Sequence, residues 1–391
     1  MYTNNIVAEI HQDDNLILIF GDFMVRVLSV GSVNPENGGK TKGGVARFHS
    51  SLIQSWMEHP ELGIELVGVA ALNSDQDSDP KTGVPYLQNR EGNSEQRMRS
   101  IIQEVQPDCI VFHHISNAWA AAISKIETDA TIIGFAHSWL YCRPENDQRY
   151  PQNLNRVKKT LTRIDHLLFL SKHCHDEMDE FVRRPNCEIS ILPPPLPVLT
   201  VNQNKNENIR NKGQIVYVGN LLSHKNPLRL VEAIQSVDNA RLVMIGNGQE
   251  GEPINRYLRQ KGLIHKCTIE NNLSDSQVSD YLNESDVFCM PSEYEAFGLV
   301  YLEALDHGLP IVGFGPSIET IETEMGMKCG VALSDYSPQS IADAIDECLS
   351  RSWDRAKLQK RVRDVFNPYS ISKRFADVIL DTYSNNQGNS R

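Results

Sequence analysis

Short apolar runs rich in Val, Ile and Leu alternate along the chain with segments whose apolar residues recur every three or four positions. The short runs predict β-strands, and the recurring pattern predicts amphipathic helices. Strands that alternate regularly with helices are typical of α/β layers built around parallel sheets. The sequence therefore predicts an α/β protein.

The alternation starts twice, once on each side of a polar stretch at 200–213. A chain of 391 residues is too long for one ordinary core and suits two domains. We expect a first domain over 1–198, a linker over 199–213 and a second domain over 214–368. We expect residues 369–391 to form a helix that packs back on the first domain and ends in a disordered tail.

The predicted elements fall into two series. Strands are expected at 23–31, 64–70, 108–114, 131–137, 166–171 and 189–197, then at 214–220, 240–248, 267–272, 286–292 and 309–315. Helices are expected at 46–59, 227–237, 254–263, 274–285 and 298–308, with Ser274 as an N-cap.

Composition excludes several classes of protein. The net charge of −12 gives no broad basic field for nucleic acid, and it disfavours strong attachment to anionic membranes while leaving weak peripheral contact open. No run reaches the roughly 20 apolar residues of a membrane span, and the N-terminus lacks the features of a signal peptide. The eight cysteines form no C-x-x-C pair. We expect a cytoplasmic protein, at most peripheral at the inner face of the membrane.

The segment EYEAFGLVYLE at 293–303 places Glu295 and Glu303 eight positions apart. It follows a fully apolar strand, and a helix is expected to start near Gly298. A helix N-terminus at the carboxyl end of a parallel strand attracts phosphate, and glycine lets a ligand approach the backbone. Carboxylates match paired hydroxyls. The alternative is that both acids are surface residues of an amphipathic helix, and on spacing alone that alternative is favoured.

Other segments change this balance. YVGNLLSHKN at 217–226 is a strand, a glycine turn and Lys225, and IGNG at 245–248 ends the next strand. With MPSEYEAFGLVYLEALDHGLPIV, this order resembles the C-terminal half of retaining glycosyltransferases of family 4, which have an acid-x7-acid motif. GGVARF, GFAHSW and HLLFLSKHCHDEM resemble segments of the N-terminal half. The resemblance implies the GT-B architecture, two Rossmann-like domains with parallel sheets that face each other across a cleft.

The resemblance also implies roles for individual residues. Lys225 and the backbone N–H groups of Gly298, Leu299 and Val300 would hold the leaving diphosphate. Glu303 would bind the ribose and Glu295 the donor sugar, while His137 would face that sugar from the other domain. A structural core position is the alternative for His137. The further expected nucleotide contacts are Gly43, Gly44, Gly219, Asn220, Gly246, Glu270, Asn271 and Phe297.

For Gly43 and Gly44 the alternative is simple glycine punctuation of a turn. Glu270 could accept hydrogen bonds from guanine, which would slightly favour GDP-sugars over UDP-sugars as donors. No cofactor and no metal are implied. Possible acceptor contacts in the first domain are Trp119, Trp139, Tyr141 and Arg143.

The implied function is transfer of a hexose-type sugar from a UDP- or GDP-sugar to a saccharide or glycolipid acceptor, in the synthesis of cell-surface polysaccharide or glycoconjugate. One departure weakens it, because the family usually has Arg where Asn220 stands. His224, or an arginine from the other domain, could compensate. The alternatives are a degenerate sugar-nucleotide-binding or scaffold protein of the same fold, and a nucleotide-sugar epimerase.

Overall fold

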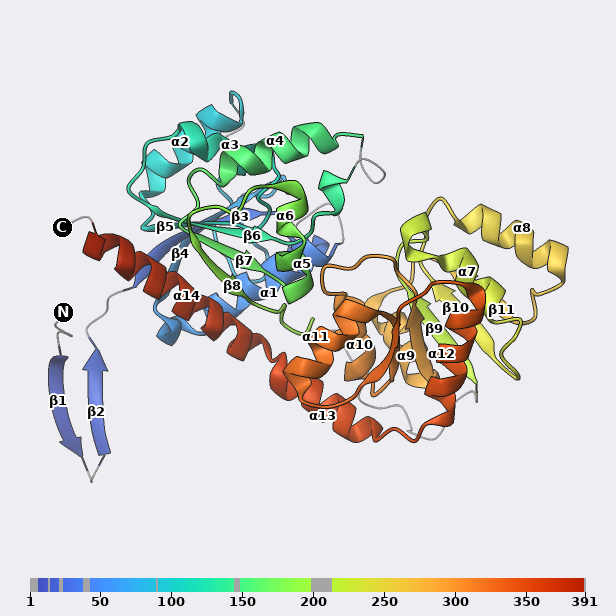
Figure 1. Cartoon of the computed structure of the whole chain (residues 1–391). Coiled ribbons are helices and arrows are strands. Elements are labelled where there is room, and N and C mark those ends of the chain that lie inside the picture. Colours follow the sequence, from blue (N-terminus) through green and yellow to red (C-terminus); the bar gives the residue numbers. More distant parts are fainter. Residues whose placement is uncertain are drawn as a thin grey trace.

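The computed structural model describes residues 6–12, 15–20, 24–37, 43–88, 91–143, 148–197 and 213–389. The predicted linker at 199–213 lies outside these ranges except for Gly213. Two six-stranded parallel sheets dominate the fold, and they stand side by side in Figure 1. The predicted α/β class with two parallel sheets is confirmed.

The first sheet has the strand order β4-β3-β5-β6-β7-β8. Its strands are β3 (Val25–Gly31), β4 (Ile64–Ala71), β5 (Cys109–Phe112), β6 (Thr131–Ala136), β7 (His166–Phe169) and β8 (Glu188–Ile191). The helices of this half are α1 (Gly44–Glu58), α2 (Ser94–Val105), α3 (Ala118–Ala122), α4 (Tyr150–Thr160), α5 (Lys172–Asp176) and α6 (Met178–Phe181).

The second sheet has the strand order β11-β10-β9-β12-β13-β14. Its strands are β9 (Gln214–Val218), β10 (Arg241–Ile245), β11 (Cys267–Glu270), β12 (Val287–Met290), β13 (Ile311–Phe314) and β14 (Gly330–Leu333). Its helices are α7 (Pro227–Ala233), α8 (Gly251–Lys261), α9 (Asp275–Glu284), α10 (Leu299–Asp306), α11 (Gly315–Met325), α12 (Pro338–Ser350) and α13 (Arg355–Val365).

Short 3-10 turns complete both halves. They are η1 (Pro35–Asn37), η2 (Pro60–Leu62), η3 (Ile123–Lys125), η4 (Leu140–Cys142) and η5 (Ser223–Lys225). An antiparallel hairpin of β1 (Ile6–Gln12) and β2 (Asn15–Phe20) precedes the first sheet, and the sequence analysis did not anticipate it.

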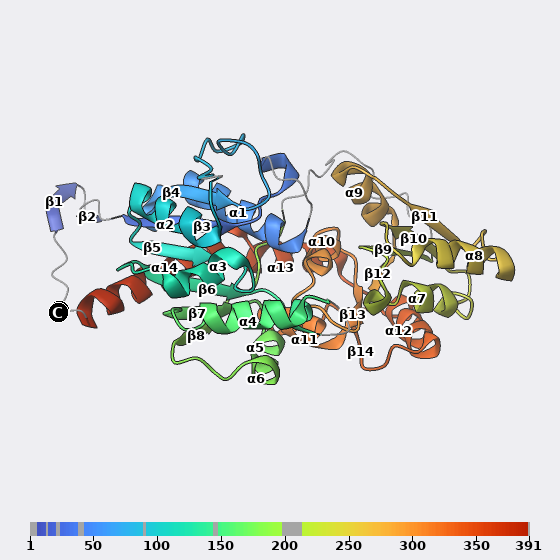
Figure 2. The same ribbon diagram turned by 90° about the horizontal axis from the view of Figure 1, so that it is seen from above.

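The last helix, α14 (Pro368–Asn389), leaves the second half and runs back along the first (Figures 1 and 2). Its Phe375 ring lies 5.2 Å from Trp56 of α1 and 5.1 Å from Phe135 of β6. One apolar cluster, which includes residues of both sheets, is continuous through this helix. The carboxyl-terminal segment thus ties the two halves together.

The expectation of a disordered tail is wrong as far as Asn389, because α14 continues through 384–389. Side chains of this polar segment find partners on the first half. Asn385 Nδ2 lies 3.4 Å from Glu188 Oε1, and Asn386 Nδ2 lies 3.2 Å from Thr131 Oγ1. These contacts supply the ordering that the composition alone does not indicate. Residues 390 and 391 lie outside the described part.

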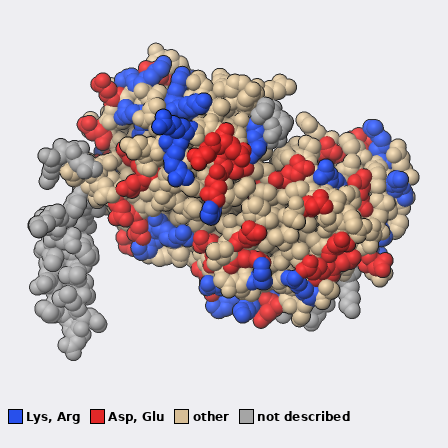
Figure 3. Space-filling view, viewed as in Figure 1, with Lys and Arg blue, Asp and Glu red and all other residues tan. Residues whose placement is uncertain are grey.

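Charge is mixed over the surface. On the face seen in Figure 3, basic and acidic side chains are interspersed over both halves, and a basic group lies next to an acidic one on the amino-terminal half. A surface of this kind presents no single-signed field on this face.

Candidate active site at the meeting of two helix N-termini

The strand orders fix where a ligand would bind. In the second sheet the order reverses between β9 and β12, and in the first between β3 and β5. Ligands of open α/β sheets bind beyond the carboxyl ends of the strands at such switch points. The turn after β9 leads to Lys225, and the loop after β12 carries Glu295 and Gly298. The fold therefore brings segments 70 residues apart to one place.

Lys225 and Glu295 form a partly buried ion pair. The Lys225 ammonium lies 2.5 Å from Glu295 Oε1, which also accepts a hydrogen bond of 2.8 Å from Ser292 Oγ. The two loops are joined again where Glu293 N donates to the His224 carbonyl at 2.8 Å. Neighbouring groups thus orient Lys225 and Glu295, two of the three residues predicted to take part in catalysis.

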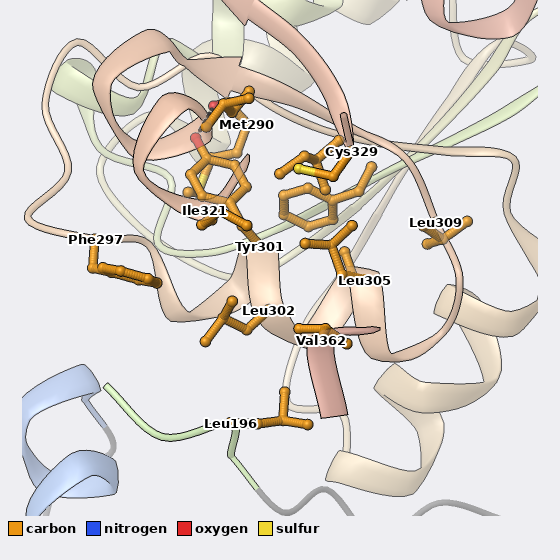
Figure 4. Close-up of a cluster of buried hydrophobic side chains, with 14 of the residues drawn as sticks. Leu196, Met290, Phe297, Tyr301, Leu302, Leu305, Leu309, Ile321, Cys329 and Val362 are labelled. Atoms are coloured by element: carbon orange, nitrogen blue, oxygen red, sulfur yellow. Dashed lines mark hydrogen bonds between the residues drawn. The ribbon is translucent and has the colours of Figure 1, made fainter. Parts of the chain in front are cut away.

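Helix α10 begins at an unusual backbone position. Its N-cap, Gly298, has φ of 85° and no side-chain cap, so the first N–H groups of α10 lack an internal partner. A Cβ at Gly298 would lie 2.4 Å from the Tyr301 ring. That ring is fixed, because its hydroxyl donates to the Met290 carbonyl at 2.9 Å (Figure 4) and accepts from Phe314 N at 3.1 Å. Only glycine fits this turn.

Phe297 was expected to contact the nucleotide sugar, but its side chain lies in the protein core. Its side chain is 1% exposed and its ring lies 5.8 Å from that of Phe366, inside the apolar core shown in Figure 4. The side chain therefore holds the loop against the core and is unavailable to a ligand. Its neighbours Leu299 and Val300 are half-buried at the start of α10.

Glu303 lies one turn inside α10 and is 3% exposed. Arg47 of α1, in the other half of the molecule, forms an ion pair with its Oε1. Arg47 also lies 3.6 Å from Asp275, the first residue of α9. Burial raises the pKa of the Glu303 carboxyl, and the Arg47 guanidinium opposes that rise. The alternative that Glu303 is a surface residue is excluded for this structure.

The start of α1 faces the start of α10. Gly43 is the N-cap of α1, with extended backbone and no side-chain cap. A Cβ placed on Gly44 would lie 3.4 Å from Leu299 Cδ1, and a Cβ on Gly43 would meet no described atom within 4 Å. Two uncapped helix N-termini, one from each half of the molecule, therefore lie close together. Each carries roughly half a positive charge, so their meeting point attracts an anion.

The first half also holds the loop that carries Glu295. Ser171 Oγ donates to the Ala296 carbonyl at 2.7 Å and caps α5 at Cys174 N. The Tyr294 hydroxyl accepts from Trp139 N at 3.3 Å. Sequence reasoning did not assign Ser171 or Tyr294 to the site, although the serine stands in a segment that carries the family resemblance.

Three further predicted contacts lie in the turns after β9 and β10. Asn220 is exposed, and its carbonyl accepts from the Tyr217 hydroxyl at 2.8 Å. A Cβ on Gly246 would lie 1.9 Å from the Gly219 carbonyl. The close approach of the two turns thus accounts for Gly246 without a ligand, and Gly219 lies beside it at the strand ends.

The predicted base site lies at the end of β11. Glu270 is half-buried and Asn271 is exposed. Glu270 accepts a side-chain hydrogen bond from Tyr281 of α9. The pKa of Tyr281 is raised, mainly by burial and next by the negative charge of Glu270. Any base that used Glu270 would share its carboxylate with Tyr281.

His137 lies at the end of β6 in a cluster of aromatic and imidazole rings. Its ring centre is 5.0 Å from Phe48 and 5.1 Å from Phe135, with His113 at 6.3 Å. Burial holds the pKa of His137 well below its usual value, so the ring is neutral. Its Nε2 is buried and has no hydrogen-bond partner among the described residues. A structural core role and a ligand contact are both compatible with this placement.

Of the possible acceptor contacts, the structure contradicts Trp139. Trp139 is 1% exposed, donates from Nε1 to the Cys174 carbonyl and stacks on Phe181, so it is no accessible platform. Arg143 is paired with Glu177 at 2.7 Å. Tyr141 is exposed, and Trp119 packs partly buried against the core.

Within the described residues, no group of three or more His, Cys, Asp or Glu side chains is arranged to hold a metal ion. None of the described helices is both long enough and apolar enough to cross a bilayer.

Two protein-family models match adjacent parts of the chain. "Glycosyltransferase Family 4" matches residues 58–198, and "Glycosyl transferases group 1" matches residues 200–365. An uncharacterised glycosyltransferase of Methanocaldococcus jannaschii is 30% identical over 162 residues, which are 40% of this chain and 41% of that protein. A D-inositol 3-phosphate glycosyltransferase of Xylanimonas cellulosilytica is 27% identical over 183 residues, 44% of this chain and 42% of that protein. Each alignment thus spans less than half of the relative's length.

Solved structures share the fold over nearly the whole chain. Anabaena HepE in complex with UDP-glucose superposes with a TM-score of 0.69 at 15% identity, covering 91% of this chain and all of that one. WaaG, a glycosyltransferase involved in lipopolysaccharide biosynthesis, superposes with a TM-score of 0.65 at 16% identity, covering 90% and 99%. The GT-B architecture implied by the sequence is confirmed.

Proposed function

Since this chain belongs to the family 4 type of glycosyltransferases, we propose that it transfers a hexose-type sugar, with retention of configuration, from a nucleotide diphosphate sugar to a saccharide or glycolipid acceptor. Cell-surface polysaccharide or glycoconjugate synthesis is the setting we propose, at the cytoplasmic side of the membrane.

One observation carries the proposal. Glu295, paired with Lys225, lies three residues before the uncapped start of α10, and the uncapped start of α1 approaches that start at Gly44 and Leu299. Cation, helix dipoles and carboxylate are the groups that a diphosphate joined to a sugar requires. An ammonium has three donor hydrogens, so Lys225 can keep its bond to Glu295 and still bind phosphate.

The proposed reaction relies on positioning and on charge. The acceptor hydroxyl bonds to the anomeric carbon on the face that the diphosphate leaves, and its proton passes to the departing diphosphate. As the bond between sugar and diphosphate breaks, negative charge grows on the diphosphate, and Lys225 with the N–H groups of Gly298, Leu299 and Val300 stabilises it. Fixed donors of this kind lower the barrier because they need no reorganisation during the reaction. Glu295 orients the donor sugar, and His137 faces that sugar from the other domain. We propose no covalent nucleophile and no metal.

Asn220 leaves one cation fewer on the second half than the family usually has. The structure offers Arg47, which crosses from α1 to the donor side, whereas His224 is neutral because burial and the neighbouring Lys225 lower its pKa. The Arg47 guanidinium is engaged by Glu303 and Asp275, so neither residue supplies a second cation to the diphosphate in this arrangement, and Lys225 carries that role with the N–H groups of α10.

The experiment is a panel of UDP- and GDP-sugars incubated with the purified chain, with release of nucleoside diphosphate measured in the presence of mixed oligosaccharide acceptors. HepE was solved with UDP-glucose, so UDP-glucose is the first donor, and Glu270 makes GDP-mannose the second. We expect release with at least one donor, and a loss of at least 100-fold in Lys225→Ala. If no nucleotide sugar binds or turns over, the proposal is wrong.

A further inference from the structure

Arg47 joins the two halves of the molecule at the acid proposed to bind the ribose. It is the fourth residue of α1, and its side chain reaches Glu303 of α10 and Asp275 of α9. The contact is possible because the starts of α1 and α10 abut at Gly44 and Leu299 (Figures 1 and 2). A residue of one domain thus completes the surroundings of a carboxylate in the other.

The surroundings of Glu303 contain few other groups that could support its charge. His307, one turn later, uses Nδ1 on the Glu303 carbonyl at 2.7 Å and Nε2 on Ser279 at 2.7 Å. Burial lowers the pKa of His307, so its ring is neutral. Asp275 adds a negative charge. Among the residues described around Glu303, Arg47 is the cation that pairs with its carboxylate.

A buried carboxylate without a cation does not stay charged and oriented. Removing the carboxylate from water favours its protonated form. When a buried ion pair loses one partner, the remaining charge is no longer compensated for its loss of hydration. Separation of the domains would withdraw Arg47, so Glu303 would lose both its charge partner and the hydrogen bond that orients it. A protonated acid offers fewer acceptor sites to the two hydroxyls of a ribose.

We propose that Arg47 is a positioning residue of the donor site, which holds the Glu303 carboxylate in place for the ribose hydroxyls and so makes tight nucleotide binding conditional on closure of the two domains. This rests on the proposed function. The opposite arrangement is a latch, in which Arg47 occupies the carboxylate and the nucleotide must displace it. The two differ in sign, since removal of a latch tightens nucleotide binding.

The test measures UDP and GDP affinity of the full chain by calorimetry between pH 6 and 8.5. The variants are Arg47→Met, Arg47→Lys, Glu303→Gln and the double variant, with Arg183→Met as a control because Arg183 is an exposed arginine of the same half. We expect Arg47→Met to bind at least tenfold more weakly at pH 6. The deficit should shrink as pH rises, because the unpaired Glu303 then ionises.

Two further results follow from the proposal. Arg47→Lys should recover part of the affinity, and Arg47→Met should cost little in a Glu303→Gln background, where no buried charge needs a partner. A merely structural arginine would instead give a deficit that is equal at every pH and adds to that of Glu303→Gln. Either that pattern or tighter binding by Arg47→Met overturns the inference.

Failure of the proposed function looks different. In that case the wild-type chain binds neither UDP nor GDP, and the inference falls with it. If the wild type binds and Arg47→Met binds equally well at every pH, only the inference falls. Thermal unfolding of each variant shows whether it is folded.

Discussion

The turn at Gly298 gives the sharpest test of the site's geometry. Replacement by alanine adds one methyl group at φ of 85°, and that methyl would lie 2.4 Å from the ring of Tyr301. The ring has little freedom to move. It is fully buried, and its hydroxyl is bonded to the backbone of both β12 and β13. Gly298→Ala therefore has two separate costs.

The first cost is conformational, and the second is steric. A left-handed backbone costs a residue with a Cβ roughly 1–2 kcal/mol, and overpacking a fixed core costs a further 1–3 kcal/mol or so. The expected loss in free energy of unfolding is therefore about 2–5 kcal/mol. A domain has only about 5–15 kcal/mol of stability in total, so the effect is large.

A matched glycine separates the two costs. Gly262 ends α8 with φ of 67°, and a Cβ there would meet no described atom within 4 Å. Gly262→Ala should show only the conformational cost, so Gly298→Ala should exceed it by about 1–3 kcal/mol in urea unfolding followed by circular dichroism. Any change in the unfolded chain is common to both variants and cancels. Nucleotide affinity should fall in Gly298→Ala alone. Equal destabilisation of the two variants would refute the geometry described for this turn.

Two other outcomes are expected. Ser171→Ala should lower the rate of sugar transfer by up to about tenfold and leave nucleotide binding normal, because the Ala296 carbonyl loses its 2.7 Å hydrogen bond. An unchanged rate would show that the loop needs no support from the first half. Burial lowers the pKa of His49 from 6.5 to about 4. Between these two values the unfolded chain binds a proton at His49 and the folded chain does not. The free energy of unfolding therefore decreases as the pH falls from 6.5 towards 4, by about 2 kcal/mol at pH 5. His113, stacked on His49 at 4.0 Å, should add to this fall, and His113→Phe should flatten it in urea titrations read by tryptophan fluorescence; an unchanged slope would contradict the assignment.

Much of the fold could be predicted because its signals are local. The strand expected at 286–292 contains β12, whose four residues Val287–Met290 are apolar and buried. Ser274 forms the expected cap with a reciprocal bond to Gln277. The order of elements then leaves few topologies, since parallel strands need crossover helices. Lys225 and Glu295 could be brought together on this basis alone, because each follows a neighbouring strand at the same edge.

The remaining features depend on contacts between distant segments. Arg47 and Glu303 are 256 positions apart, and nothing in GGVARF indicates which acid the arginine meets. The burial of Phe297 and Trp139 was also beyond local pattern, because an aromatic residue beside a site can face a ligand or the core. The order of the polar tail depends on Asn385 and Asn386 meeting the first half.

The central claim is that a diphosphate binds where the starts of α10 and α1 meet, and a crystal structure of the chain grown with UDP or GDP tests it most directly. We predict phosphate oxygens within hydrogen-bond distance of the N–H groups of Leu299 and Val300 and of Lys225 Nζ, with the ribose hydroxyls on Glu303. A nucleotide bound elsewhere, with the Lys225–Glu295 pair and the start of α10 free of phosphate, would contradict the account.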